Sequence, residues 1–85
     1  MLSNMGKYAL KEYIKAKINK NDKMHMYITS NDESEKRDAL NAWSYYNGEM
    51  SAFIEMLKFE LSEMDVNRII CLLPILIDIF QDTDV

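Results

Sequence analysis

The chain has 85 residues, of which 48% are hydrophobic and 28% charged, and its formal net charge at pH 7 is −4. This length allows one domain at most, and the composition is far from the apolar-poor, highly charged signature of disorder. The single cysteine, Cys71, excludes an internal disulfide framework, and the single histidine, His25, excludes a Cys/His zinc site within one chain. Because a domain of this size hides only about 60% of the surface of its unfolded chain, we expect self-association to add stability.

The N-terminal third predicts a helix over about residues 4–28. Only two glycines and one proline punctuate the whole chain, which favours long helices over short strands. One stripe recurs at steps of three and four: Leu10, Ile14, Ile18, Asn21, His25 and Ile28. The polar segment 19–22 offers an alternative, earlier end of the helix, because Asn and Asp bond locally to the backbone. No continuous apolar segment of a signal peptide is present, and we predict a cytoplasmic protein.

Charge is divided unevenly along the chain. Residues 1–23 hold six lysines against two acidic residues, a balance of +4, whereas residues 24–85 hold four basic and twelve acidic residues, a balance of −8. Lys7, Lys11 and Lys15 follow one another at steps of four and predict a basic stripe on the first helix. Such a stripe is usually a solvated face or complements an acidic surface. Contact with nucleic acid phosphates is the alternative, which the sequence pI near 4.8 disfavours.

A second helix is predicted over about residues 31–61. Ser30 and Glu33 have the spacing of a capping box. A heptad seam follows at alternating steps of three and four: Leu40, Trp43, Asn47, Met50, Ile54, Leu57 and Leu61. Asn47 within this seam would fix the register of the packed helices. The dipeptide Asn47-Gly48 is also a turn signal, but the flanking residues do not alternate as strands do, so we favour a continuous helix.

Aromatic residues cluster in the middle of the second helix. Trp43 belongs to the seam and is expected in the core, whereas Tyr45 and Tyr46 cannot both share its face. At least one tyrosine should therefore be exposed, as in many protein interfaces. Met50 is one of seven methionines, whose flexible side chains suit adaptable binding surfaces. We expect Tyr45, Tyr46, Met50 and the lysine stripe to contact a partner protein.

The C-terminal segment predicts an apolar helix over about residues 65–80, with Ser62 and Asp65 repeating the capping pattern. Pro74 predicts a kink or a split into two helices. One apolar stripe holds Val66, Ile69, Ile70, Leu73, Ile77 and Phe80. The opposite side is apolar too and holds Leu72, Ile75, Leu76 and Ile79. We expect that second side to bind a twin subunit, and Cys71 to be a small core side chain. A strand over 75–80 is the alternative. The apolar run 69–80 is too short for the ~20 residues that a membrane span needs.

No pattern of catalytic or phosphate-binding residues is present, so we expect neither enzymatic activity nor a metal or cofactor. The bias toward Lys, Asn, Ile and Met is loosely similar to that of small accessory proteins of bacteria and their phages. The sequence thus predicts an all-α protein: an antiparallel helical hairpin with a short, kinked, apolar C-terminal helix, assembled as a homodimer. Its expected function is to bind another protein as an adaptor or inhibitor. The alternative is a small transcriptional or DNA-associated regulator that uses the lysine stripe.

Overall fold

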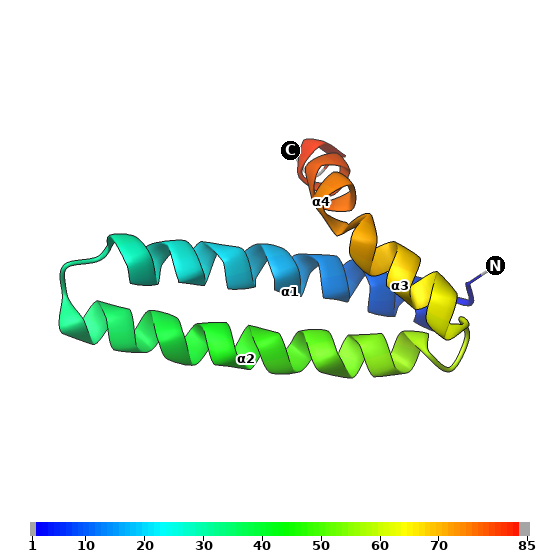
Figure 1. The fold of residues 1–85 in the computed structure, drawn as a ribbon, viewed down its shortest axis with the longest axis horizontal. Helices are drawn as coiled ribbons and strands as arrows, with labels where there is room; N and C mark the ends of the chain where they lie inside the picture. The colour runs from blue at the N-terminus through cyan, green and yellow to red at the C-terminus, as the bar shows by residue number, and fades with distance from the viewer. Residues whose placement is uncertain (1, 84–85) are drawn as a thin grey trace.

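The computed structural model describes the backbone of residues 2–83 and the side chains of residues 2–79. Four α-helices follow one another: α1 Asn4–Thr29, α2 Glu33–Leu57, α3 Glu63–Cys71 and α4 Leu73–Thr83. Two long helices pack together, and α3 and α4 form a shorter C-terminal arm (Figure 1). The all-α prediction is confirmed for the described residues, and the alternative strand over 75–80 is wrong because this segment is helical.

Helix α1 runs without interruption through the polar segment 19–22, so the alternative early end is wrong. Its N-cap is Ser3, whose side chain accepts a hydrogen bond from the backbone amide of Gly6. Within the polar segment, the ammonium group of Lys20 donates a hydrogen bond of 3.0 Å to Asn47 Oδ1 on α2. Contact with α2 thus holds a segment that is weak by helix propensity alone.

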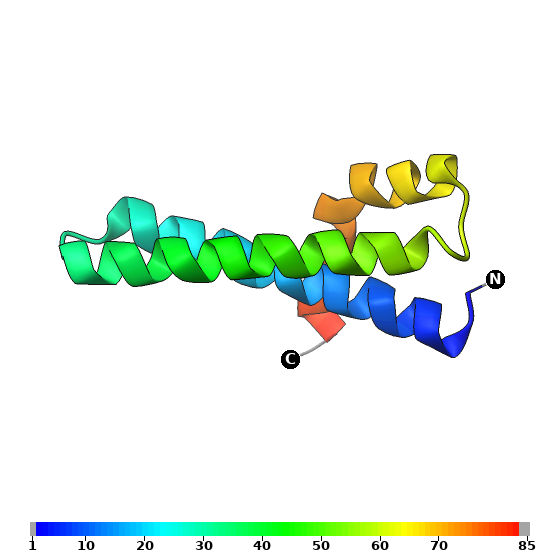
Figure 2. The same ribbon diagram turned by 90° about the horizontal axis from the view of Figure 1, so that it is seen from below.

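Helices α1 and α2 run in opposite directions along most of their length (Figures 1 and 2). The contacts between them join the beginning of α1 to the residues after α2, through Ser3 and Glu60, and the middle of α1 to the middle of α2, through Lys20 and Asn47. The contact faces are rich in small residues that are almost fully buried: Gly6, Ala9, Ala16 and Ala39. Small side chains allow the two helix backbones to approach closely.

Helix α2 begins differently from the capping box expected at Ser30. Asp32 is the N-cap, and its carboxylate accepts a hydrogen bond of 2.9 Å from the amide of Ser34. The hydroxyl of Ser30 is already engaged in the preceding turn, where it accepts from the amide of Asp32 and donates to Glu35. The predicted cap at Ser30 is therefore wrong. Asp32 is closer to the first helical turn and its carboxylate is free to accept from the helix amide, whereas the Ser30 hydroxyl has other partners.

Helix α2 continues through Asn47 and Gly48, as expected. It ends at Leu57 and not near residue 61, since 58–60 form a turn in which the amide of Leu61 donates back to Leu57. Asn47 is exposed, so a buried register-setting role is wrong. Trp43 is half-buried, with the Lys20 ammonium 5.1 Å from its ring centroid.

The seam expected along α2 is covered only in its second half. Leu57 is fully buried with Ala9 and Val66, and Met50 and Ile54 pack beside Tyr13. Leu40, in the first half, is 42% exposed. The reason lies in the arm, because α3 and α4 lie over the half of the hairpin near the N-terminus and leave the other half as two helices alone (Figure 1).

The arm is two helices and not one. Ser62 caps α3 by accepting from the amide of Asp65, and the arm bends at Leu72 before Pro74 (Figure 2). The proline has no amide hydrogen to donate within the helix, which favours a break here. Val66 and Leu73 face the hairpin and are buried. Cys71 is exposed, so its expected role as a core side chain is wrong. The side chain of Phe80 lies outside the described residues.

Candidate interaction surfaces

The tyrosine pair of α2 lies partly on the surface. Tyr45 is 64% exposed, whereas Tyr46 is half-buried. Their rings meet edge to face, with centroids 5.4 Å apart and an angle of 71° between the ring planes. Helical geometry places adjacent residues 100° apart, which is why only one ring turns fully outward. The pair therefore presents one exposed aromatic side chain held in place by a second.

Met50 lies apart from the exposed ring of Tyr45. Its side chain is half-buried and packs against the core cluster formed by Tyr13, Ile14 and Leu73. Met50 lies five residues from Tyr45, on another face of α2, and four residues after the half-buried Tyr46, on the same side of the helix. Met50 thus contributes to packing between the hairpin and the arm, and its contact with a partner protein stays a prediction.

The lysine stripe lies on α1. Lys7 and Lys11 are exposed, and Lys15 is half-buried with its ammonium group 3.8 Å from the Glu12 carboxylate. Buried residues of α1 such as Ala9 and Tyr13 are on the side that faces the core. The stripe and the tyrosine pair lie on different helices, and no hydrogen bond or ring contact among the described residues links them. They are two separate surfaces.

The outward side of the arm carries three of the four residues predicted for self-association. Leu72, Ile75 and Ile79 are 50%, 57% and 55% exposed. Leu76 differs, because it packs against the cluster of Tyr13, Ile14 and Leu73. Residues 73, 76 and 77 share the inner face of α4, and this spacing turns residues 75 and 79 away from the hairpin. The expectation is corrected for Leu76.

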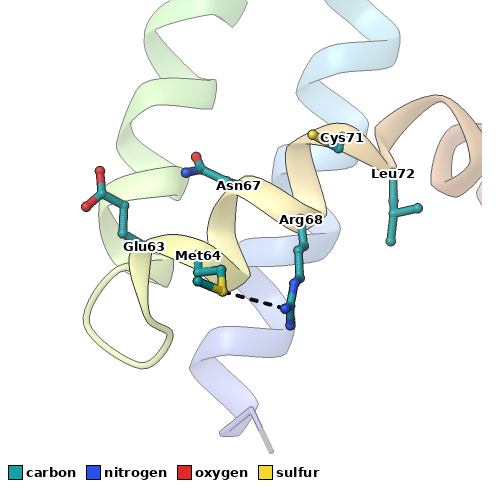
Figure 3. Close-up of a pocket in the computed structure, with 6 residues that line it drawn as sticks. All are labelled: Glu63, Met64, Asn67, Arg68, Cys71 and Leu72. Carbon is teal, nitrogen blue, oxygen red and sulfur yellow. Dashed lines mark hydrogen bonds between the residues drawn. The ribbon is translucent and has the colours of Figure 1, made fainter.

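Helix α3 extends this apolar surface in a way that the sequence predictions missed. Its outward face bears a shallow groove lined by Glu63, Met64, Asn67, Arg68, Cys71 and Leu72 (Figure 3). Met64 is 64% exposed, and its sulfur accepts a hydrogen bond of 3.5 Å from Arg68 Nη2. Arg68 also pairs with Asp65 at 3.5 Å. The seven-residue spacing of Met64 and Cys71 was the available signal, since it places both on one helix face.

Within the part of the chain that the structure describes, no group of three or more His, Cys, Asp or Glu side chains converges as a metal site would require. His25 and Cys71 are exposed on different helices. Among the same residues, none of the helices combines the length and the apolar character that a membrane-spanning helix needs.

Comparison with known proteins found no matching family model, no similar curated protein and no similar solved structure.

Proposed function

We propose that this chain is a small, non-enzymatic protein-binding module that forms a homodimer through the outward face of its arm and binds a further protein through its hairpin. The accessible surface area carries this proposal. The chain exposes 6033 Å². A compact monomer of 10.0 kDa is expected to expose roughly 5,200 Å². The excess of about 800 Å² equals the area that one partner buries in a standard protein interface.

The shape of the chain explains this excess. Its radius of gyration is 14.3 Å, whereas a compact domain of the same length has roughly 12 Å. Among residues 2–79, the largest side chains that are buried completely are Leu57 and Val66. A core this small leaves apolar surface for a partner to cover.

A second copy of the chain is the partner proposed for the outward face of the arm, because both arm helices expose apolar residues there. Leu72 lies at the bend, Ile75 and Ile79 follow it on α4 at steps of three and four, and Met64 and Cys71 precede it on α3. In a two-fold dimer each copy uses the same patch, so one apolar face is sufficient for both partners. The burial of such side chains contributes about 25 cal/mol per Å² before the cost of association.

Size-exclusion chromatography with light scattering tests the dimer. The native chain should have twice the monomer mass of 10.0 kDa at micromolar concentration. Leu72→Asp combined with Ile75→Asp should give the monomer, because two charges would be buried in the apolar contact. Ile28→Asp is the matched control, since Ile28 is 69% exposed on α1, away from the arm. A native mass near 10.0 kDa at these concentrations contradicts the dimer.

The second partner is a different protein, bound through the tyrosine pair, and the chain would act on it as an adaptor or inhibitor. Tyrosine is enriched among the residues that dominate binding energy at interfaces, and Tyr45 is exposed while Tyr46 holds its ring. A pulldown from the source cell should recover a specific protein with the native chain and lose it with the variant Tyr45→Ala/Tyr46→Ala. The variant Lys7→Ala/Lys11→Ala, altered on α1, should keep it. Equal recovery by all three chains contradicts this interface.

A further inference from the structure

A cleft separates the arm from the hairpin, on the inner side of the bend between α3 and α4. Its volume is about 510 Å³, within the roughly 300–1,000 Å³ of sites that hold small organic ligands. Its walls are largely apolar. Met50 contributes from α2, and Ile70, Leu73 and Ile77 contribute from the arm. This surface is separate from the outward face proposed for the dimer.

Helix α1 brings an unpaired hydroxyl to this cleft. Tyr13 is only 4% exposed, and its hydroxyl has no hydrogen-bond partner among the described residues. Every completely buried side-chain oxygen or nitrogen among the described residues has a hydrogen-bond partner. Because the Tyr13 hydroxyl has none, it is not completely buried. The hydroxyl therefore reaches open space at one of the two hollows that Tyr13 lines, of which this cleft is the larger. Burial raises the pKa of Tyr13, so the group remains a protonated donor at neutral pH.

Lys17 brings a cation to the wall of the same cleft. It lines the same cleft four residues after Tyr13, and side chains at this spacing lie next to each other on a helix. Lys17 is half-buried and has no ion pair or hydrogen bond with a described residue. Tyr13 also borders a smaller groove of about 240 Å³ near Asn47, but no cation lines that groove. Two adjacent donors, one of them charged, suit a negatively charged acceptor.

We propose that the cleft between the hairpin and the arm binds an organic anion with an apolar body. The carboxylate or sulfonate of this ligand accepts hydrogen bonds from the Tyr13 hydroxyl and the Lys17 ammonium group, and its body packs on Met50, Leu73 and Ile77. Asp78 lines the cleft from α4. Its negative charge repels the anion and keeps the charged end of the ligand on the α1 side.

Fluorescence titration of the full chain with 8-anilinonaphthalene-1-sulfonate tests this site, because the probe has an apolar body and one sulfonate. We expect saturable binding at one site per chain. Tyr13→Phe keeps the ring and removes the donor, and Lys17→Met keeps the stem and removes the charge. Each should raise the Kd about five- to tenfold, as expected for the loss of a charge-assisted hydrogen bond. Lys11→Met removes the same charge from an exposed position of α1 and should leave the Kd within about twofold.

Two further variants separate the cleft from misfolding and from other apolar surfaces. Asp78→Asn should lower the Kd about twofold or more, because a repulsive charge is removed, and a gain in affinity does not arise from unfolding. The variant Leu72→Ser/Ile75→Ser, which makes the outward face of the arm polar, should keep the native Kd whether or not the dimer forms. The proposal is overturned if Tyr13→Phe and Lys17→Met leave the Kd unchanged, or if the Leu72/Ile75 variant alone abolishes binding.

Discussion

The carboxylate of Glu60 accepts a hydrogen bond of 2.9 Å from the backbone amide of Ser3, 57 positions earlier in the chain. The Ser3 hydroxyl in turn caps α1. Glu60 thus places a negative charge at the positive end of the α1 dipole and joins the turn after α2 to the start of the chain. Hydrogen bonds with Ser3 lower the pKa of Glu60 below its usual 4.5, and the bond with the Ser3 side chain contributes more than the bond with its backbone.

A lowered pKa predicts acid sensitivity at this contact. A carboxyl group with a lower pKa in the folded state stabilises the fold above its ordinary pKa of 4.5, and this contribution is lost as the pH falls through the lower, folded-state value. In Glu60→Gln, the urea midpoint should depend less on pH below 4.5 than it does in the native chain. Glu55→Gln, which breaks an exposed pair with Lys58, should keep the native slope. Parallel pH profiles for the native chain and Glu60→Gln would contradict the contact.

The two glycines should respond differently to alanine. A Cβ at Gly48 meets nothing within 4 Å, so Gly48→Ala should stabilise the helix by about 0.5–1 kcal/mol. A Cβ at Gly6 would lie 2.6 Å from Glu60 Oε2, and the carboxylate would have to move. Gly6→Ala should therefore gain less or lose stability. Urea denaturation of both variants measures the difference, and an equal gain at both positions would show that Glu60 does not approach Gly6.

Leu57 is the centre of the core shared by the hairpin and the arm, because it is fully buried against Ala9 and Val66. Leu57→Ala should cost about 2–5 kcal/mol, a large part of the stability of a domain this small. Leu40→Ala is the matched control because Leu40 is 42% exposed on the same helix. Thermal melts followed by circular dichroism should show a much larger drop in Tm for Leu57→Ala. Similar drops would mean that the arm does not cover Leu57.

The cap of α2 at Asp32 is open to a direct test. Asp32→Ala removes the carboxylate that accepts from the Ser34 amide and should cost about 0.5–2 kcal/mol. Asp38→Ala, an exposed substitution inside the same helix, should change stability by less than about 0.5 kcal/mol. The free energy of unfolding from urea titrations compares them. An equal cost for the two variants would argue against the Asp32 cap.

Local patterns predicted much of the secondary structure. The helix start at Ser62 and the continuity of α2 through Gly48 follow from cap spacing and from apolar periodicity, which act over a few residues. The sequence predicted Ser30 as the cap of α2, whereas the cap is Asp32. Both residues lie close to the helix start, and the Ser30 hydroxyl already accepts a hydrogen bond from the amide of Asp32.

The candidate surfaces were predicted less completely, because a sequence pattern does not say which neighbour covers a given face. At least one of the two tyrosines was expected to be exposed, and Tyr45 is. The cleft at Tyr13 and Lys17 was not predicted, since it exists only where the bent arm meets the hairpin. The outward position of Cys71 was also missed, because an apolar stretch of sequence does not distinguish a covered face from an uncovered one.

The sequence by itself determined that the chain is helical and that its C-terminal segment is apolar on more than one side, because these properties follow from residue type and spacing. Only the tertiary structure decided the direction of the bend at Leu72. That bend turns Leu73 and Leu76 toward Tyr13 and Ile14, and leaves Leu72 and Ile75 exposed. The sequence of a helix with two apolar faces does not determine which face is buried, so packing against α1 determines it.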